Sequence, residues 1–137
     1  MLLHVDIPTE SDLRALAEAR NPASVSIFLP TTPVAGEISG DRIVLKNLAH
    51  EALAQLEAAG HPKKEREAIE DALAELVDDD DFWRFQANSL AIYATPEAVR
   101  TFRVPNALTA AVAVSDRFHL KPLLRAGELD LIVGRSE

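Results

Sequence analysis

Two cations lie four residues apart at the predicted start of a long helix, in Asp41-Arg-Ile-Val-Leu-Lys-Asn47. Arg42 and Lys46 therefore fall on one face of that helix. The first turns of a helix carry unpaired backbone N–H groups and the positive end of the helix dipole, and both attract anions. With Thr31 at the end of the preceding strand, this segment predicts a site for a small anion or carboxylate. The alternative is that the two cations neutralise nearby acids such as Glu37 and Asp41.

A second segment of interest is Phe82-Trp-Arg-Phe-Gln86, which holds the only tryptophan of the chain. Exposed aromatic rings next to an arginine can stack on nucleic-acid bases. The alternative, which we favour, is that the rings fill the junction between helices and sheet, leaving Arg84 and Gln86 exposed or lining a pocket. His119 is a further candidate for lining the anion pocket. The candidate binding residues are Thr31, Arg42, Lys46, Asn47, Arg84, Gln86, His119 and Lys121.

Four consecutive aspartates, Asp78 to Asp81, offer the oxygen ligands that Mg²⁺ or Ca²⁺ prefers. Their spacing is not that of a calcium loop, and no glycine turn directs alternate carboxylates inward. We interpret the run as a solvated helix end whose last aspartate caps the next segment. The four histidines (4, 50, 61 and 119) share no ligand spacing. We therefore expect no bound metal and no cofactor.

Ser115, Asp116 and His119 supply the residue types of a hydrolase triad. The segment is too short to direct the three side chains at one another in the geometry that catalysis needs. The chain has no Gly-x-Ser-x-Gly motif and no glycine-rich phosphate loop, and the absence of cysteine excludes a thiol nucleophile. We therefore expect no catalytic residues and a protein that is not an enzyme.

The elements that must position these residues follow from periodicity and from turn residues. Apolar positions at three- and four-residue steps indicate helices, and short apolar runs between turn formers indicate strands. Thr9 and Asp12 form a helix-start signal, and Gly60-His-Pro62 separates two amphipathic helices. The predicted elements are a helix over 9–20, a strand over 24–29, an ordered loop or mobile flap over 31–40, helices over 41–59 and 62–77, strands over 89–94, 101–104 and 109–114, a helical turn or two within 118–125 and a last strand over 129–133.

The order of these elements predicts an α+β fold. The short connections after residue 94 are too short for parallel crossovers, so we expect the last three strands before residue 115 to form an antiparallel meander. The two central helices form an antiparallel hairpin that packs on the sheet. We predict one domain over residues 1–137, with a largely antiparallel sheet of four or five strands and the hairpin on one face, in two or three layers.

Composition limits the classes of function. The 137 residues are 47% hydrophobic and 26% charged, as in an ordinary globular protein. No apolar run is long enough to span a bilayer, and the first residues lack the basic region of a secretory signal. The absence of cysteine fits a reducing compartment, so we expect a cytoplasmic protein. The net charge of −8 repels phosphate backbones, so direct nucleic-acid binding is disfavoured.

A series of motifs in the chain matches a known family. The motifs, in order, are Val25-Ser-Ile-Phe-Leu-Pro-Thr31, Arg42-Ile-Val-Leu-Lys-Asn47, Phe82-Trp-Arg-Phe-Gln86, Leu90-Ala-Ile-Tyr93 and Val114-Ser-Asp-Arg-Phe-His-Leu-Lys-Pro-Leu-Leu124. Over residues 22–125 the chain resembles the N-terminal region of the bacterial relatives of archaeal and eukaryotic peptide-chain release factors, the baeRF group. Phe118-His-Leu-Lys-Pro-Leu-Leu124 is the most specific of these motifs.

The resemblance implies a non-catalytic first domain of a three-domain protein. In the family the peptide-releasing Gly-Gly-Gln loop belongs to a following domain. This chain has no Gly-Gly pair, and neither Gln55 nor Gln86 follows a glycine. The motifs that read stop codons in the eukaryotic proteins are not recognisable either. We therefore expect no hydrolysis of peptidyl-tRNA by this chain alone.

Three hypotheses of function follow. The first is an interaction domain that binds a protein partner or a ribosome-associated factor. The second is a domain or enzyme for a small anionic ligand, with its pocket near Arg42 and Lys46. The third is a structural homodimer, in which the apolar segment Leu129 to Val133 pairs at a sheet edge.

Overall fold

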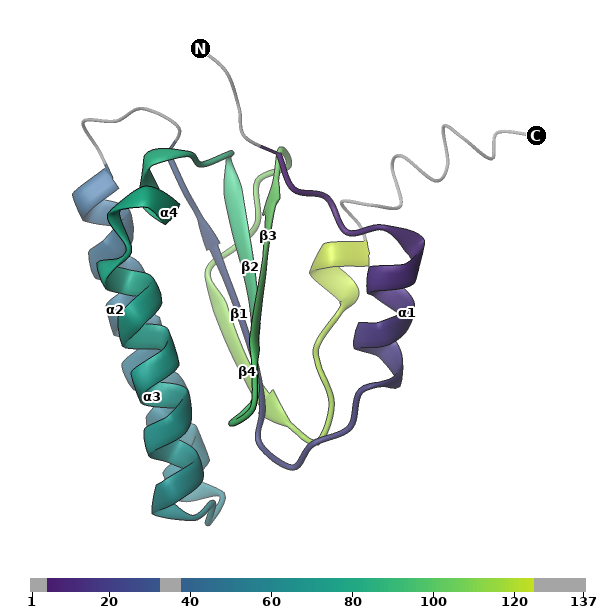
Figure 1. Ribbon diagram of the computed structural model, residues 1–137, viewed down its shortest axis with the longest axis vertical. Helices are drawn as coiled ribbons and strands as arrows, with labels where there is room; N and C mark the ends of the chain where they lie inside the picture. Colours follow the sequence, from purple (N-terminus) through teal and green to yellow (C-terminus); the bar gives the residue numbers. More distant parts are fainter. Residues whose placement is uncertain (1–4, 33–37, 125–137) are drawn as a thin grey trace.

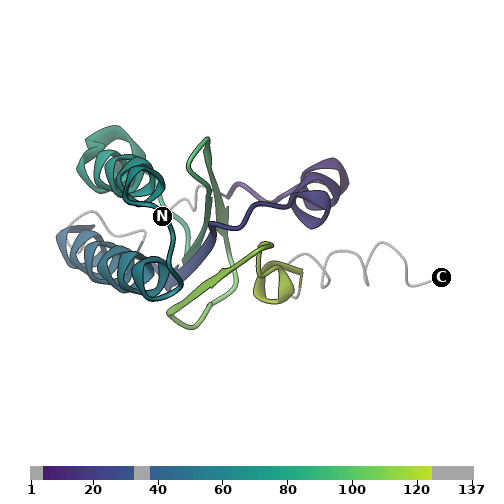
Figure 2. The ribbon, with the colours of Figure 1, turned by 90° about the horizontal axis from the view of Figure 1, so that it is seen from below.

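A computed structural model describes residues 5–32 and 38–124 of the chain. A four-stranded antiparallel sheet, in the order β3-β2-β1-β4, lies between two layers of helix (Figures 1 and 2). The α+β prediction is confirmed, with three layers. The predicted strand over 129–133 lies outside the described residues, as do residues 33–37 of the predicted loop. The elements are α1 (Glu10–Glu18), β1 (Ser24–Pro30), α2 (Ile38–Ala58), α3 (Lys63–Asp78), α4 (Asp80–Arg84), β2 (Ser89–Ala94), β3 (Val99–Val104) and β4 (Ala111–Ser115).

Helix α1 begins at the predicted capping signal. The Thr9 hydroxyl accepts from the Asp12 N–H at 3.0 Å, and the Asp12 carboxylate accepts from the Thr9 N–H at 2.9 Å. These two bonds satisfy backbone donors that the first turn leaves unpaired. The Thr9 N–H, together with the Arg100 guanidinium 2.7 Å away, holds the pKa of Asp12 below its usual value. Because Arg100 belongs to β3, the same carboxylate also ties α1 to the sheet.

Helices α2 and α3 form the predicted antiparallel hairpin. Gly60 ends the first helix with a φ of 83°, in the left-handed region where a Cβ would be strained. Helix α3 starts directly after Pro62. Helix α2 begins at Ile38, three residues before the predicted start, so the end of the predicted loop is helical.

Strand β1 lies at the centre of the sheet because its residues are buried on both faces. Its first six residues are all buried. Because buried backbone groups without a partner are costly, the N–H and C=O groups on both of its edges need partners within the sheet. Strand β2 pairs with one edge and β4 with the other, both antiparallel. The predicted meander is therefore wrong in one respect: β2 and β3 form a hairpin, but β4 pairs with β1 and not with β3. The connection after β3 crosses the end of β2, where the Leu108 N–H donates to the Ser89 hydroxyl at 2.7 Å.

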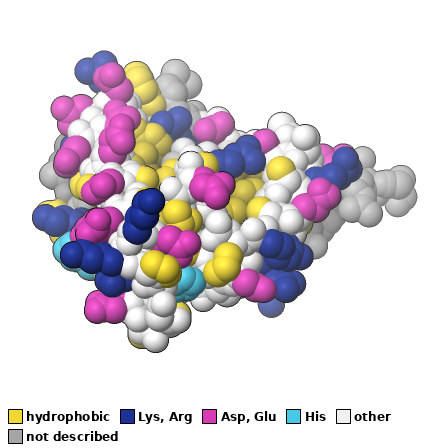
Figure 3. Space-filling model, turned by 60° about the horizontal axis from the view of Figure 1, so that its bottom comes forward, with side chains coloured by type: hydrophobic (Ala, Val, Ile, Leu, Met, Phe, Trp, Pro, Cys, Tyr) yellow, Lys and Arg dark blue, Asp and Glu magenta, His cyan; other side chains and the backbone are white. Residues whose placement is uncertain are grey.

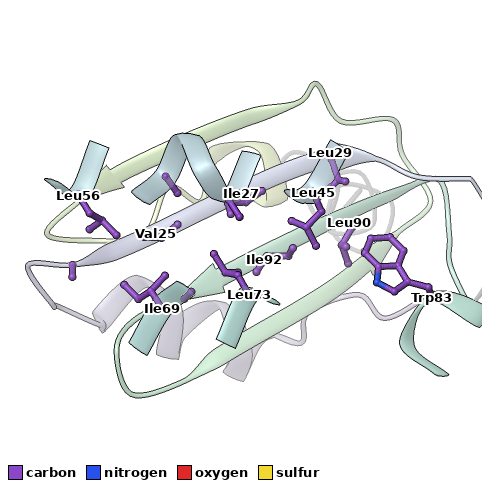
Figure 4. Packing of buried hydrophobic residues seen from close by; sticks show 14 residues of the cluster. Val25, Ile27, Leu29, Leu45, Leu56, Ile69, Leu73, Trp83, Leu90 and Ile92 are labelled. Atoms are coloured by element: carbon purple, nitrogen blue, oxygen red, sulfur yellow. The ribbon is translucent and has the colours of Figure 1, made fainter. Parts of the chain in front are cut away.

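Alternate residues of β1 and β2 face two separate cores. On one face, Val25, Ile27, Leu90 and Ile92 pack against the apolar stripes of α2 and α3, as Figure 4 shows. On the other face, Phe28 and its neighbours pack against Leu16 of α1 and Leu123 of the helical turn at 121–124. Each fully buried aliphatic or aromatic side chain contributes about 1.5–3 kcal/mol relative to exposure, so the sheet depends on both layers. Among the described helices, none has the length and apolar character needed to cross a bilayer.

Candidate functional site

The predicted anion site lies where the start of α2 meets α4. Here the Arg42 guanidinium forms an ion pair with the Asp80 carboxylate at 2.7 Å, and its side chain is 26% exposed. Helix α2 starts at Ile38, so Arg42 lies in its second turn and Lys46 in its third. The prediction that both cations stand beside unpaired N–H groups of the first turns is therefore wrong. Arg42 does neutralise an acid, but the acid is Asp80, which comes from a distant part of the chain.

Thr31, the third member of the predicted anion site, has a structural role. Its hydroxyl donates to the Ala87 carbonyl at 2.8 Å, and its N–H donates to the Asn88 carbonyl at 2.9 Å. The residue is 8% exposed. These bonds join the end of β1 to the segment that leads into β2, so the Thr31 hydroxyl has no proton left for an anion.

The aromatic segment packs at the junction of helices and sheet, as predicted for Trp83. The indole is fully buried, and its Nε1 donates to the Leu76 carbonyl in the last turn of α3 at 2.9 Å. The residue that caps the short helix α4 is Asp79, whose carboxylate accepts from the Phe82 N–H at 3.0 Å. The prediction that the last aspartate of the run is the cap is therefore wrong.

Two polar candidates around this segment differ in exposure. Arg84 is exposed, as predicted. Gln86 was predicted to be exposed or to line a pocket, but it is 2% exposed, and its Nε2 donates to the Phe82 carbonyl at 2.9 Å. The Arg103 guanidinium lies over the Phe82 ring, 4.7 Å from its centroid. Gln86 is therefore part of the packing beneath this junction.

His119 and Lys121 lie on the other side of the sheet from Arg42. The His119 N–H donates to the Ser26 hydroxyl at 2.9 Å, and its carbonyl accepts from the Tyr93 hydroxyl at 3.1 Å. Ser26 and Tyr93 alternate with the β1 and β2 residues that face the hairpin, so their side chains point away from it. The prediction that His119 lines the same pocket as Arg42 is therefore wrong. Lys121 is exposed at the start of the helical turn.

The three residues near the end of β4 that match the residue types of a hydrolase triad each interact with other groups. The Ser115 hydroxyl donates to the Arg117 carbonyl at 2.7 Å. Asp116 lies 3.3 Å from the Arg117 guanidinium, which holds the pKa of that carboxyl below its usual value. His119 contacts Phe28 with its ring. In this part of the described chain the three side chains do not form a proton relay.

A groove along the outer seam between α2 and α3 was not predicted. One recess, of about 260 Å³, is lined by Lys46, Ala49, His50 and Leu53 of α2 and by Glu70, Leu73, Ala74, Val77 and Asp78 of α3. A second recess continues from His50 toward Glu57, Lys63 and Arg66. The residues recur at three- and four-residue steps beside the apolar stripes, which is the signal that could have revealed them. The groove brings Lys46 close to carboxylates of the opposite helix.

Opposite charges pair at both ends of the hairpin. Arg42 near the start of α2 pairs with Asp80 beyond the end of α3, and Arg66 near the start of α3 lies 3.7 Å from Glu57 at the end of α2. Cations near the start of a helix and acids near its end oppose the helix dipole. The cross-hairpin pairs offset that cost, because antiparallel helices bring the two kinds of end together. These exposed pairs add a small electrostatic contribution to a helix pairing that the apolar stripes of α2 and α3 provide.

The metal prediction can be compared only with the described residues. Among residues 5–32 and 38–124, no three His, Asp or Glu side chains lie close enough together to hold a metal ion. The first recess of the groove offers one imidazole, one ammonium group and two carboxylates around a small apolar floor. Such a lining can accept a polar or basic side chain from a partner.

Replacing Arg42 with alanine is expected to lower the free energy of unfolding by less than about 1 kcal/mol, because the Asp80 partner is 88% exposed. Urea denaturation measures this change, and Lys46→Ala is the matched control. A loss of several kcal/mol would contradict the view that this is a solvent-screened pair.

Comparison with known proteins supports the fold and no more. No family model matches the chain, and no curated protein matches it. A solved structure described as "Archaeal protein" is similar, with a TM-score of 0.59 and 16% sequence identity. The similarity covers 89% of this chain and 36% of that one, so the chain spans about a third of the length of that protein.

Proposed function

We propose that this chain is a non-catalytic N-terminal interaction domain of a release factor-like protein, associated in the cytoplasm with translation or with the ribosome. The proposal is supported by the motif series, which resembles the first domain of the baeRF group.

The observation that carries the proposal is the role of the most specific motif, Phe118 to Leu124. Leu123 is buried in the second core, Phe118 and Leu120 pack against it, and the Phe118 ring lies 5.1 Å from the Tyr93 ring. Its backbone bonds to the Ser26 and Tyr93 hydroxyls. The motif therefore closes one face of the sheet. In a family of binding domains, the matching motifs are expected to build the scaffold, as this motif does. In a family of enzymes, the matching motifs are expected in the active site.

The hairpin is the surface that we assign to partner binding. Residues 40–85 hold twelve Asp and Glu against six Lys and Arg, and Figure 3 shows acidic side chains over this side of the molecule. Asp71 and Glu75 of α3 are exposed and form no ion pair with any described residue. An acidic surface attracts a basic protein surface and repels nucleic acid. We therefore propose a basic protein, such as a component of the translation machinery, as the partner.

Co-sedimentation with ribosomes at low and moderate salt tests this proposal. The chain is expected to move with the ribosomes or their associated factors at low salt and to be released as salt rises, because screening weakens contacts between surface charges. The double variant Asp71→Asn with Glu75→Gln is expected to lose most of the bound fraction. The matched control, Glu18→Gln with Glu97→Gln, changes the net charge equally on other elements and is expected to bind normally. Equal loss in both variants, or no binding under any condition, would contradict the proposal.

A further inference from the structure

The two edge strands of the sheet differ in how they are protected. Strand β3 carries Arg100 and Arg103, and the Arg103 carbonyl accepts from the Asp6 N–H of the N-terminal segment. Strand β4 has the sequence Ala-Val-Ala-Val-Ser, without charge or proline. Natural edge strands usually carry a lysine, a proline or a bulge that prevents pairing with another chain. Among the described residues, β4 has none of these devices.

The register of the sheet identifies the backbone groups that β4 presents outward. The Thr31 N–H donates to the Asn88 carbonyl of the segment before β2. In an antiparallel ladder the bonding direction alternates along a strand, so Ser24, Ser26 and Phe28 of β1 bond to β4. Their partners on β4 are Ser115, Ala113 and Ala111. The N–H and C=O groups of Val112 and Val114 therefore point away from β1, at the outer edge that Figure 2 shows.

We propose that two copies of this chain associate through β4, in antiparallel register about a two-fold axis at Ala113. In that register Val112 of each copy exchanges both backbone bonds with Val114 of the other, so four hydrogen bonds form. The strand suits this arrangement because its sequence reads almost the same in both directions. A two-fold contact requires such self-complementarity, since each copy contributes the same surface.

The side chains on both faces of β4 fit the same register. Val112 and Val114 already pack against the hairpin core, and in the dimer they form two cross-strand valine pairs that continue this core. Ala113 faces Ala113 of the second copy, where a small side chain allows the closest approach. Helix α2 contacts both β1 and β4, so the two α2 helices would lie side by side. Val44, 38% exposed, lies on the flank of α2 away from the groove.

Charge limits the surface through which a second copy can bind. Two copies with a net charge of −8 each repel one another, so an interface between them must keep exposed acids such as Asp71 and Glu75 of α3 apart, and β4 packs on α2. Residues 109–115 carry no charge at all. Strand β4 is therefore the part of the described sheet where like-charged copies can approach at low electrostatic cost.

A cysteine scan tests the proposed register in the full chain, which has no cysteine of its own. In the proposed register, residue 113 of one copy lies opposite residue 113 of the other, in a pair without backbone hydrogen bonds between them. The two thiols of Ala113→Cys then have Cα atoms about 4.5 Å apart, within disulfide range. Mild oxidation is expected to cross-link this variant and double its mass from 14.9 kDa on a non-reducing gel. In the control Ala111→Cys the thiols are about 13 Å apart in this register, so cross-linking is expected to be lost.

Sedimentation of the unmodified chain provides the second readout, with an expected mass of twice the monomer. Mixing Ala113→Lys with Ala113→Glu is expected to yield a mixed dimer, while each variant alone is expected to sediment as a monomer with an unchanged circular-dichroism spectrum. Only a pairing that places residue 113 opposite itself gives this result. A monomeric chain whose two cysteine variants cross-link equally slowly would overturn the proposal, and it would mean that β4 is covered by another segment or protein.

Discussion

Replacing Trp83 with alanine is expected to lower the free energy of unfolding by about 3–5 kcal/mol, the usual cost of deleting a buried aromatic side chain. The indole is fully buried where α3, α4 and the sheet meet. Its Nε1 also donates to the Leu76 carbonyl at the end of α3, which accepts from the Asp79 N–H as well. The variant therefore loses apolar packing and a helix-end hydrogen bond together.

Chemical denaturation followed by circular dichroism measures this loss, because the variant has no tryptophan left for fluorescence. Trp83→Phe is the control, since it keeps most of the ring packing and removes the bond to the Leu76 carbonyl. It is expected to cost about 1–3 kcal/mol. Exposed aromatic platforms for base stacking contribute little to stability, so a Trp83→Ala variant of unchanged stability would contradict the core-packing interpretation.

Replacing Tyr93 with alanine is expected to be nearly as costly, at about 3–5 kcal/mol. The ring is 1% exposed and contacts Phe28, Phe102 and Phe118 edge to face. Its hydroxyl donates to the His119 carbonyl and so holds the 118–124 motif on the sheet. Tyr93→Phe keeps the ring contacts and is expected to cost only about 1–2 kcal/mol. Equal losses in the two variants would mean that the hydroxyl, and not the aromatic cluster, dominates.

Alkaline pH provides a second test of the same residue. Burial raises the pKa of Tyr93 well above its ordinary value of 10.0. The unfolded chain loses the phenolic proton near pH 10 while the folded chain keeps it. The contribution to stability is therefore complete below about pH 10 and is lost as pH rises toward the folded pKa, by about 1.4 kcal/mol per pH unit.

The phenol absorbance measures this shift directly, because Tyr93 is the only tyrosine in the chain. The folded protein is expected to show no tyrosinate signal until the pH lies well above 10, and the unfolded protein is expected to titrate normally. In Tyr93→Phe the part of the loss of stability at alkaline pH that is coupled to ionisation of the Tyr93 phenol is expected to be absent. Normal titration of Tyr93 in the folded protein would contradict its burial.

Local sequence signals predicted the individual elements because each signal acts within a few residues. The Thr9 and Asp12 side chains cap α1 as expected, and Gly60 ends α2 with the positive φ that only glycine adopts easily. The strand predicted over 89–94 matches β2 at both ends. Capping bonds, turn conformations and apolar periodicity involve near neighbours in the chain, so the sequence is sufficient to locate them.

The candidate site was harder to predict because its residues bond to distant parts of the chain. Arg42 pairs with Asp80, thirty-eight positions away, and Thr31 bonds to Ala87, fifty-six positions away. The predicted pocket combined Arg42 with His119, although the sheet separates them. Gln86 was predicted from its polarity to be accessible, but the fold buries it. Spacing shows which residues share a helix face, and it does not show what lies opposite that face.

The sequence by itself determined the α+β class and the helical hairpin. Only the tertiary structure decided that β4 pairs with β1, that the most specific motif packs in the second core, and that β4 is an edge strand of the described sheet. The reason is that the strand order depends on two requirements of β1 at once. The side chains on both of its faces are buried, and the backbone groups on both of its edges pair with neighbouring strands. Both requirements involve contacts between residues far apart in the chain, to which local propensities are insensitive.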